Sequence, residues 1–494
     1  MNLVNAKVAQ FLADAPMATF VGGEWVRGSA PSISVIDPGT GRQLSTVSAA
    51  SQTDVDQAVS SAQGAFLSDA WRGRAPSNRA LYLFRLADLI ERDAAIISEI
   101  ESRDVGKPKY QASTFDIPHA AATFRYYANL AVATPRADSV AIEGGEAWSI
   151  RQPVGVCGFI FPWNFPFLLI AWGIAPALAA GNTVVIKPAE DTPLSTLYFA
   201  KLVEEAQFPP GVVNIIPGIG EITGAALAAH PGLGRLSFTG STEVGRLVAE
   251  ACGRNLVPVK LELGGKGAAI VFDDVNISAT AQALSAAITL NTGQVCCTAT
   301  RWLVQKDIWD DFIAAAKQAL SDVSVGYGPE ISSGMGPLVS DKQRRRVLSF
   351  VDRGIGEGAK ALLLGGRLSP KNYENGFYVG ASLLSGDPEN ICAREEIFGP
   401  VAFAMPFDTE AEAVSLTNFS RYGLANSIWS HDLSRARRVA EELIAGNSWI
   451  NAHNVFPHGV TYGGCNLSGL GGGVLGPDAL DDYVRKQSIV RSIQ

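Results

Sequence analysis

The sequence predicts an α/β fold with more than one domain, in which helices cover parallel sheets. From Asn182 onward, short β-branched runs alternate with helical patterns, and a second alternating series follows Cys296. Strands that alternate with helices favour parallel pairing, since parallel neighbours need a crossover connection, usually a helix. A chain of 494 residues is also too long for one ordinary core.

The first part of the chain predicts extended structure and then helices. Residues 18–47 form the extended region, and Ser77 is placed as the N-cap of a helix over 77–90. Apolar side chains in that helix recur with the spacing of one face, at Leu83, Leu86, Ala87 and Ile90. Prolines and Asn164 interrupt the apolar segment 156–180, so we expect a buried turn and helix there and no membrane span.

Two series of strands and helices follow. In the first, strands are expected at 183–187, 212–216, 235–238 and 268–272, with helices at 193–206, 221–230 and 241–253. In the second, helices are expected near 307–323, 341–357, 409–418 and 432–443, with strands near 401–405, 424–429 and 446–450. The tail, 483–491, alternates like a strand and needs a partner, for which a second subunit is one candidate.

Composition and charge exclude several classes of protein. Apolar residues make up 47% of the chain and charged residues 18%, as in a well-buried globular enzyme. The net charge of −8 and the lack of basic runs argue against nucleic-acid binding. Residues 1–10 lack an export signal and the six cysteines lack disulfide spacing, which favours free thiols and a cytoplasmic protein. No His or second Cys pair lies at ligand spacing, so no metal is expected.

A cysteine and a carboxylate are the main candidates for covalent chemistry. Cys296 lies between a polar turn and an expected helix start, where a thiolate has a lowered pKa and attacks carbonyl carbon. Glu262 ends an apolar run before two glycines and could act as a general base that activates water. The alternatives are a buried structural cysteine and an ordinary salt bridge. Cys297 is expected to pack in the core, since neighbouring side chains cannot both face one site.

Polar turns predict further contacts to a ligand. Gly240 and Ser241 lie between an expected strand and helix, where a helix N-terminus favours negative charge. Lys187 and Glu190 follow another strand and could hold ribose hydroxyls. Asn164 offers an amide N–H to an oxyanion, a contact whose loss typically costs about 3–4 kcal/mol of barrier. The alternatives are an ordinary strand–turn–helix connection, a solvated charge pair and a turn asparagine.

The joint presence and order of six motifs indicate a family. The chain resembles the aldehyde dehydrogenase superfamily from about Phe20 to the C-terminus. The motifs are Pro162-Trp-Asn-Phe-Pro166, Lys187-Pro-Ala-Glu190, Phe238-Thr-Gly-Ser-Thr242, Glu262-Leu-Gly-Gly-Lys266, Gly293-Gln-Val-Cys296 and Glu395-Glu-Ile-Phe-Gly-Pro400.

This resemblance implies an NAD-dependent oxidation of an aldehyde and a role for each matched residue. Cys296 attacks the aldehyde, Asn164 and the Cys296 backbone N–H hold the oxyanion, and a hydride passes to the nicotinamide. Glu262 then activates the water that hydrolyses the thioester. Because Glu190 would repel a 2′-phosphate, NAD is favoured over NADP. The matched cofactor positions are Trp163, Lys187, Glu190, Gly220, Gly240, Ser241, Glu396 and Phe398.

The resemblance also implies a domain organisation. A Rossmann-type NAD-binding domain is expected from 1–136 and 156–264, and an α/β catalytic domain from 265–465. A small oligomerisation sheet is expected from 137–155 and 480–494. Members of the family are dimers or tetramers, and we expect a homotetramer.

The chain departs from the family pattern at two places. Many relatives carry Lys after the tryptophan that Trp172 matches, and Arg-Glu after the motif matched by 468–471. This chain has Gly173 at the first place and Gly472-Gly473 at the second. If that Lys and Glu relay protons in relatives, this chain lacks both. We therefore expect Glu262 to work with water alone or with help from the backbone.

Positions that match the family's substrate tunnel are mostly aromatic and include no Arg or Lys. A flat apolar slot suits an aryl or arylalkyl aldehyde and disfavours substrates that bear a carboxylate. The positions are Phe165, Trp172, Val295, Phe456 and Tyr462, with His119 at the tunnel mouth. The tail 475–483 and the overall pattern most resemble family members that oxidise phenylacetaldehyde, and this resemblance implies phenylacetaldehyde as the substrate. The alternatives are a broad-range apolar or aliphatic aldehyde dehydrogenase, a CoA-acylating enzyme, which Glu262 disfavours, and a non-catalytic structural protein of the same fold.

Overall fold

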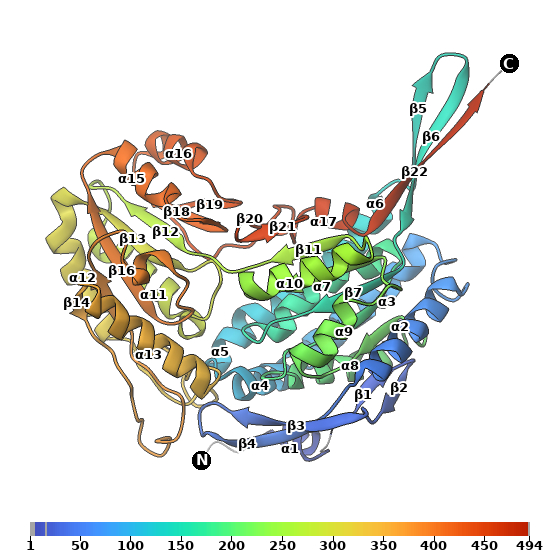
Figure 1. Ribbon diagram of the computed structural model, residues 1–494, viewed down its shortest axis with the longest axis horizontal. Helices are drawn as coiled ribbons and strands as arrows, with labels where there is room; N and C mark the ends of the chain where they lie inside the picture. The colour runs from blue at the N-terminus through green and yellow to red at the C-terminus, as the bar shows by residue number, and fades with distance from the viewer. Residues whose placement is uncertain (1–4, 15–16, 493–494) are drawn as a thin grey trace.

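The computed structural model describes residues 5–14 and 17–492, and in it helices cover two large sheets while a small sheet projects from one end (Figure 1). This arrangement confirms the α/β class that the alternating pattern predicts. The domain limits given above stay predictions. Residues 1–4, 15–16 and 493–494, which belong to the predicted first and last segments, lie outside the described residues.

The largest sheet has eight strands, and those in its middle run parallel. The parallel strands are β7 (Val156–Ile160), β8 (Thr183–Lys187), β9 (Val213–Ile215), β10 (Arg235–Thr239) and β11 (Val259–Glu262). Antiparallel strands extend it on both sides: β1 (Thr19–Val21), β2 (Glu24–Val26) and β21 (Gly469–Leu470). The spatial order is β2-β1-β9-β8-β7-β10-β11-β21. The carboxyl ends of β10 and β11 therefore lie side by side, at Thr239 and Glu262.

Helices cover both faces of this sheet. On one face lie α7 (Pro166–Ala180) and α8 (Leu194–Glu205); on the other lie α2 (Gln52–Leu67), α9 (Ala225–Ala228) and α10 (Thr242–Arg254). The side chains of β7 alternate between the two faces of the sheet. Cys157 and Phe159 pack in the core beneath α7 and α8, and Val156 and Ile160 pack in the core on the opposite face. The helix expected over 221–230 is instead a π-helical turn, Gly220–Gly224, followed by the short α9.

Further N-terminal helices lie on the same side of the sheet as α7 and α8 and enlarge the core there. They are α1 (Ala6–Ala13), α3 (Pro76–Arg92), α4 (Ala94–Val105), α5 (Lys109–Gln111), the π-helical turn Ala112–Asp116 and α6 (Ile117–Ala133), beside the hairpin β3 (Ala30–Asp37) and β4 (Arg42–Ala49). Helix α3 buries the predicted face. Its predicted N-cap, Ser77, is wrong. The cap is Ala75 and the helix begins at Pro76, because the fixed φ of proline suits a first helical position whose N–H needs no partner.

The second sheet has seven strands and its own two core clusters. Its strands are β12 (Gly267–Val271), β13 (Ala299–Gln305), β14 (Lys360–Leu363), β15 (Ser382–Ser385), β16 (Val401–Phe407), β18 (Ala425–Trp429) and β19 (Asn447–Ile450). The order is β14-β15-β16-β13-β12-β18-β19. The pattern grouped 268–272 with the first series, but β12 pairs with β13 and β18 here. Its helices are α11 (Ile277–Thr289), α12 (Trp309–Ser321), α13 (Asp341–Gly356), α14 (Ile391–Arg394), α15 (Glu410–Asn418) and α16 (Leu433–Glu442), with 3₁₀ turns at Leu290–Gly293 and Lys306–Ile308.

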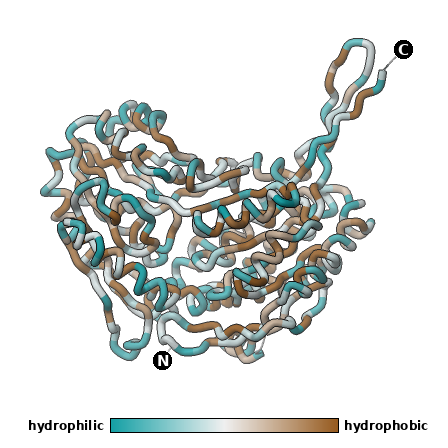
Figure 2. The backbone as a smooth tube through the Cα atoms, viewed as in Figure 1, coloured by the Kyte–Doolittle hydropathy of each residue, from teal (hydrophilic) through white to brown (hydrophobic). Residues whose placement is uncertain are grey.

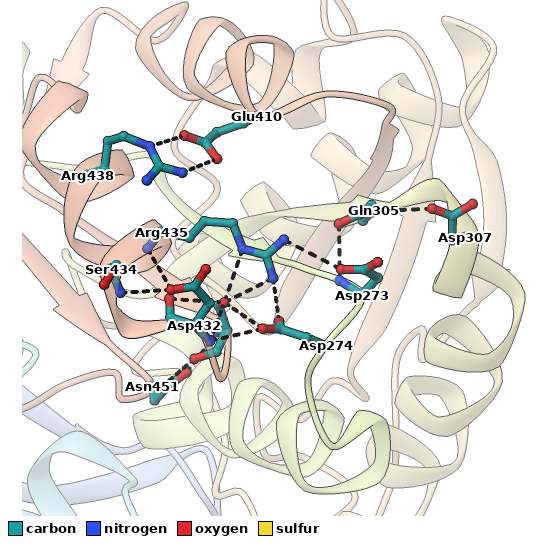
Figure 3. Close-up of polar contacts among 11 residues, drawn as sticks. Asp273, Asp274, Gln305, Asp307, Glu410, Asp432, Ser434, Arg435, Arg438 and Asn451 are labelled. Atoms are coloured by element: carbon teal, nitrogen blue, oxygen red, sulfur yellow. Dashed lines mark hydrogen bonds and ion pairs between the residues drawn. The ribbon is translucent and has the colours of Figure 1, made fainter.

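A polar cluster fastens α16 to the loop that follows β12 (Figure 3). The guanidinium of Arg435 lies 2.8 Å from the carboxylate of Asp274 and 3.6 Å from that of Asp273. It also stacks 4.3 Å above the ring of Phe272.

Hydrophobic segments run through the sheets and the helices that face them, whereas α13 and α16 carry more hydrophilic residues on the outside (Figure 2).

The small projecting sheet joins distant parts of the chain. It contains β5 (Ala137–Ile142), β6 (Gly145–Pro153) and β22 (Val484–Ser492), in the order β22-β6-β5. The tail strand pairs with β6 of its own chain, and not with a second subunit, which was one candidate partner. Two further elements, α17 (Asp478–Asp481) and the short ladder of β17 (Tyr422–Gly423) with β20 (Cys465–Asn466), lie along the C-terminal segment. Within residues 5–14 and 17–492, no helix has the length and apolar character of a membrane span.

Candidate active site

A cavity of about 1220 Å³ brings together residues from both large sheets. The ends of β10 and β11 contribute Thr239 and Glu262, and the loop before β13 contributes Cys296. Asn164, from the loop between β7 and α7, lines the same space. The three residues predicted to carry the chemistry, Cys296, Glu262 and Asn164, thus share one cavity.

The loop that carries Cys296 is held by its own side chains. Asn291 and Thr292 have left-handed φ angles of 45° and 57°, which other contacts must maintain. The Asn291 amide donates to the Asn164 carbonyl at 2.8 Å, and the Val339 N–H donates to the Gln294 side chain at 3.0 Å. The expected helix start after Cys296 is wrong, because the chain continues into β13.

The pKa of the Cys296 thiol differs from the one that the sequence predicted. Its hydrogen bond with Cys297 and its burial raise the pKa of the Cys296 thiol well above the ordinary value. The expectation of a lowered pKa is therefore wrong in this structure, since it depended on a helix start. The hydroxyl of Tyr462 lies 3.6 Å from the Cys296 sulfur and acts in the opposite direction.

Cys297 has partners of its own. Its side chain is only 1% exposed, and its thiol donates to the Asn454 side-chain oxygen at 3.4 Å. Its carbonyl lies 2.9 Å from Nε2 of His453. These contacts hold Cys297 in place, but it lines the same cavity as Cys296, so the expectation that neighbouring side chains cannot both face one site is wrong.

Glu262 is buried without a hydrogen-bond partner. Among the described residues, neither of its carboxylate oxygens is hydrogen-bonded. Burial raises the pKa of Glu262 well above its ordinary value, although the charge of Lys260 opposes this effect. A carboxylate of this kind is a strong base that can take a proton from water.

The side-chain amide of Asn164 can donate a hydrogen bond to a ligand. Its side chain is 4% exposed and donates to the Gln294 carbonyl at 3.0 Å, which leaves the second amide N–H of the group free for a ligand. The backbone N–H of Cys296 has no backbone acceptor among the described residues. Both groups can therefore donate to an oxygen atom in the cavity.

Several of the predicted cofactor residues line the same cavity. Ser241 is the N-cap of α10, and its hydroxyl accepts from the Val244 N–H at 3.3 Å, so a helix N-terminus faces the cavity. Glu396 accepts from the Gly265 N–H at 2.9 Å, and burial raises its pKa to about 7. The residues of this group are Trp163, Gly240, Ser241, Glu396 and Phe398.

The remaining cofactor candidates, Lys187, Glu190 and Gly220, are not among the residues that line the cavity but contact each other. Lys187 donates to Glu190 at 2.6 Å, and the Gly220 N–H donates to the other carboxylate oxygen at 3.4 Å. Burial favours the neutral form of Glu190, but the charge of Lys187 outweighs it and the pKa of Glu190 is lowered. Since Lys187 is 2% exposed, the pair is not an ordinary solvated one.

Aromatic rings form one wall of the cavity. The ring centroids of Trp172, Phe456 and Tyr462 lie 5.2 to 5.9 Å from one another, in tilted and edge-to-face contacts. Phe165 and Val295 line the same region. Phe115 also lines the cavity, from the π-helical turn before α6, and no motif in the sequence indicated it.

His119 lies one layer behind this wall. It is not among the residues that line the cavity, so its predicted position at the tunnel mouth needs correction. The Trp172 indole N–H donates to Nδ1 of His119 at 3.1 Å, and Nε2 of His119 donates to the Phe456 carbonyl at 2.8 Å. The histidine, which belongs to α6, therefore contacts the Trp172 ring and the backbone of Phe456.

The cavity reaches one of the two departures from the family pattern, because Gly173 lines it together with Ser237. Gly472 and Gly473, the second departure, are not among its lining residues. Lys260 lies nearby and was missed in the sequence, although its spacing from Glu262 gave a signal: residues two apart on a strand share one face.

Comparisons with known proteins agree with this geometry. The sequence profile described as "Aldehyde dehydrogenase family" matches residues 25–489. A phenylacetaldehyde dehydrogenase of Pseudomonas fluorescens is 40% identical, over 96% of this chain and 96% of its own length. Retinal dehydrogenase 2 of Homo sapiens is 39% identical, over 96% of this chain and 91% of its own length. The NAD⁺ complex of an aldehyde dehydrogenase from Bacillus cereus superposes with a TM-score of 0.96 at 35% identity, covering 100% of this chain and 99% of that one.

Proposed function

Because the chain belongs to the aldehyde dehydrogenase family, we propose that it oxidises an aromatic or arylalkyl aldehyde to the carboxylic acid through an acyl group on Cys296. The chain is an oxidoreductase, and its cofactor is NAD. The observation that carries the proposal is the single cavity in which Cys296, Glu262 and Asn164 meet a wall of aromatic rings.

The residues present fit NAD. Glu190 and Lys187 suit the hydroxyls of the adenosine ribose, and the negative charge of Glu190 disfavours a 2′-phosphate. Ser241 presents a helix N-terminus to the diphosphate. Gly264 lies so close to Glu396 that a Cβ would collide with its carboxylate, which leaves the carboxylate a defined place for the second ribose. When bound, NAD accepts the hydride that leaves the substrate carbon.

The chain's own residues perform the acyl chemistry. The Cys296 sulfur bonds to the aldehyde carbon as the thiol proton passes to water, and Asn164 and the Cys296 N–H donate to the oxygen that becomes negative. After oxidation to the thioester, Glu262 takes a proton from water as the water oxygen bonds to the acyl carbon. The carbon–sulfur bond then breaks, Cys296 regains its electron pair, and the acid leaves.

The aromatic wall supports an aryl substrate, with phenylacetaldehyde as our best candidate. Edge-to-face rings hold a planar group well, and no Lys or Arg lies among Phe165, Trp172, Val295, Phe456 and Tyr462. The relative named for phenylacetaldehyde and the one named for retinal are nearly equal in identity, so a broad range of apolar aldehydes is the competing candidate.

Steady-state kinetics separate these candidates. We expect kcat/KM for phenylacetaldehyde to exceed that for acetaldehyde, benzaldehyde and hexanal at fixed NAD. Equal values across the set favour the broad range. The product should be the free acid with or without CoA, whereas a CoA thioester would indicate acyl transfer to CoA. NAD reduction by the aldehyde should be lost in Cys296→Ser, and its survival would remove the basis of the proposal.

We also propose a cytoplasmic homo-oligomer, with a tetramer favoured, assembled through the projecting sheet. Two apolar side chains are exposed on this sheet: the exposed fraction is 49% for Val140 and 67% for Val490. The free cysteines suit a reducing compartment. Light scattering after gel filtration measures the assembly, and Val490→Asp should reduce its mass. An unchanged mass would place the contact elsewhere.

A further inference from the structure

A lysine is buried beside the proposed base. Lys260 is fully buried in β11 and stands two residues before Glu262, so both side chains project from the same face of the strand. The register aligns them with Ser237 and Thr239 of β10, which also project from that face. Burying an ammonium group is costly unless its partners compensate, so this lysine requires a structural or functional reason.

Its partners come from the C-terminal segment. The Lys260 ammonium donates to the Gly473 carbonyl at 2.8 Å and lies 3.5 Å from the Asp482 carboxylate. Asp482 also lies 3.5 Å from the guanidinium of Arg235 on β10. The ring of Tyr483 faces the ammonium at 5.2 Å. On β7, Cys157 is near enough for the Lys260 charge to act on its thiol.

The Gly473 segment also reaches Glu262. A Cβ on Gly463 would lie 3.0 Å from the Gly473 Cα and 3.3 Å from a Glu262 carboxylate oxygen. Gly473 and the Glu262 carboxylate therefore both lie next to the same side of Gly463. By binding the Gly473 carbonyl, Lys260 fixes the segment that borders the base.

We propose that Lys260, held by Asp482 and the Gly473 carbonyl, is a positioning residue that keeps Glu262 ionised while water attacks the acyl group on Cys296. This inference rests on the proposed function. It replaces the expectation that Glu262 works with water alone or with help from the backbone, because a lysine stands on the same face of β11. Burial lowers the pKa of Lys260, and the charges of Asp482 and Glu262 oppose that effect.

The expected effect of removing the cation follows from its sign. Burial raises the pKa of Glu262, and the positive charge of Lys260 opposes that rise, while Asp482 and Cys296 add to it. A neighbouring opposite charge typically shifts a carboxyl pKa by about 1–3 units. Loss of Lys260 should therefore move the ionisation of Glu262, and with it deacylation, to higher pH. Neutralising Asp482 should move both to lower pH.

Deacylation can be measured without NAD. p-Nitrophenyl acetate acylates the Cys296 thiol and releases p-nitrophenolate, and water then cleaves the acyl–sulfur bond. The variants are Lys260→Met, Lys260→Arg and Asp482→Asn. Lys306→Met, which removes an exposed lysine paired with Asp408, is the matched control. For each, the burst reports acylation and the slow phase, followed against pH, reports deacylation.

We expect Lys260→Met to keep its burst but to shift the acidic limb of the slow phase upward by about one pH unit or more, a roughly tenfold loss below the limb. Lys260→Arg should restore the limb, and Asp482→Asn should displace it downward. Coincident limbs in all folded variants would overturn the inference, as would a loss of burst and slow phase together. If Lys260→Met does not fold, Lys260→Gln, which keeps a donor for the Gly473 carbonyl but carries no charge, replaces it and should show the same upward shift. Absence of any burst in the wild type with ester, and with aldehyde plus NAD, would instead remove the proposed function.

Discussion

The phenolic oxygen of Tyr462 lies 3.6 Å from the sulfur of Cys296, at the end of the aromatic wall. This is a polar contact within otherwise apolar surroundings, and it favours the thiolate against the opposing effects of Cys297 and burial. The wall thus supplies both the surface for an aryl group and one hydrogen bond to the nucleophile.

Replacing Tyr462 with phenylalanine should slow the attack of Cys296 on the aldehyde. The ring contacts to Trp172 and Phe456 remain, but one hydrogen bond of about 0.5–1.5 kcal/mol is lost, which corresponds to roughly 2- to 12-fold in rate. The pre-steady-state burst of NADH measures this step. An unchanged burst rate would mean that the hydroxyl does not assist the thiol.

The pH dependence of thiol alkylation should reflect the raised pKa of Cys296. Only the thiolate reacts with iodoacetamide, so inactivation should be slow at neutral pH and should accelerate above the ordinary range for a cysteine. In Cys297→Ala the main cause of the shift is gone, and the profile should move to lower pH. Peptide mapping by mass spectrometry assigns the modified residue. Rapid modification of Cys296 at pH 7 in the wild-type protein would contradict this prediction.

Glu262→Gln should separate the two halves of the reaction. The amide fills the same volume but cannot accept a proton from water, so the acyl group should remain on Cys296. We expect a burst of about one NADH per active site and a loss of steady-state turnover of about 10²- to 10⁴-fold. Intact-protein mass spectrometry should show the added acyl mass. Normal turnover in this variant would assign the base elsewhere.

The sequence predicted elements well where one pattern governed them. Residues 183–187 form β8 as expected, because a β-branched run between turns has no competing helical pattern. The segment after Cys296 was read as a helix start, yet Ala299–Gln305 forms a buried strand whose apolar run lacks clear alternation. In the site, motifs located Cys296, Glu262 and Asn164. They could not reveal Phe115 or the neighbours of Lys260, which are brought there by tertiary packing.

Adding a glutamate at the second departure should not help the enzyme. A Cβ on Gly473 would lie 2.6 Å from the Tyr462 carbonyl oxygen and 2.7 Å from a Thr461 methyl group, so Gly473→Glu must displace the backbone beside the aromatic wall. We expect a loss of stability of roughly 1–3 kcal/mol and a lower kcat, with the largest effect on deacylation because Lys260 binds the Gly473 carbonyl. Thermal unfolding and the slow phase of ester hydrolysis measure these effects.

Gly173→Ala provides the comparison, because there the added Cβ meets the tip of the Phe161 ring at 2.8 Å. A side chain can turn aside more easily than a backbone carbonyl can move, so this variant should lose less stability and keep most of its turnover. If Gly473→Glu instead raised turnover, the steric contact between position 473 and Tyr462 would not impair the action of Glu262 as the base. A carboxylate at 473 would then serve Glu262 better than the buried Lys260–Asp482 pair does.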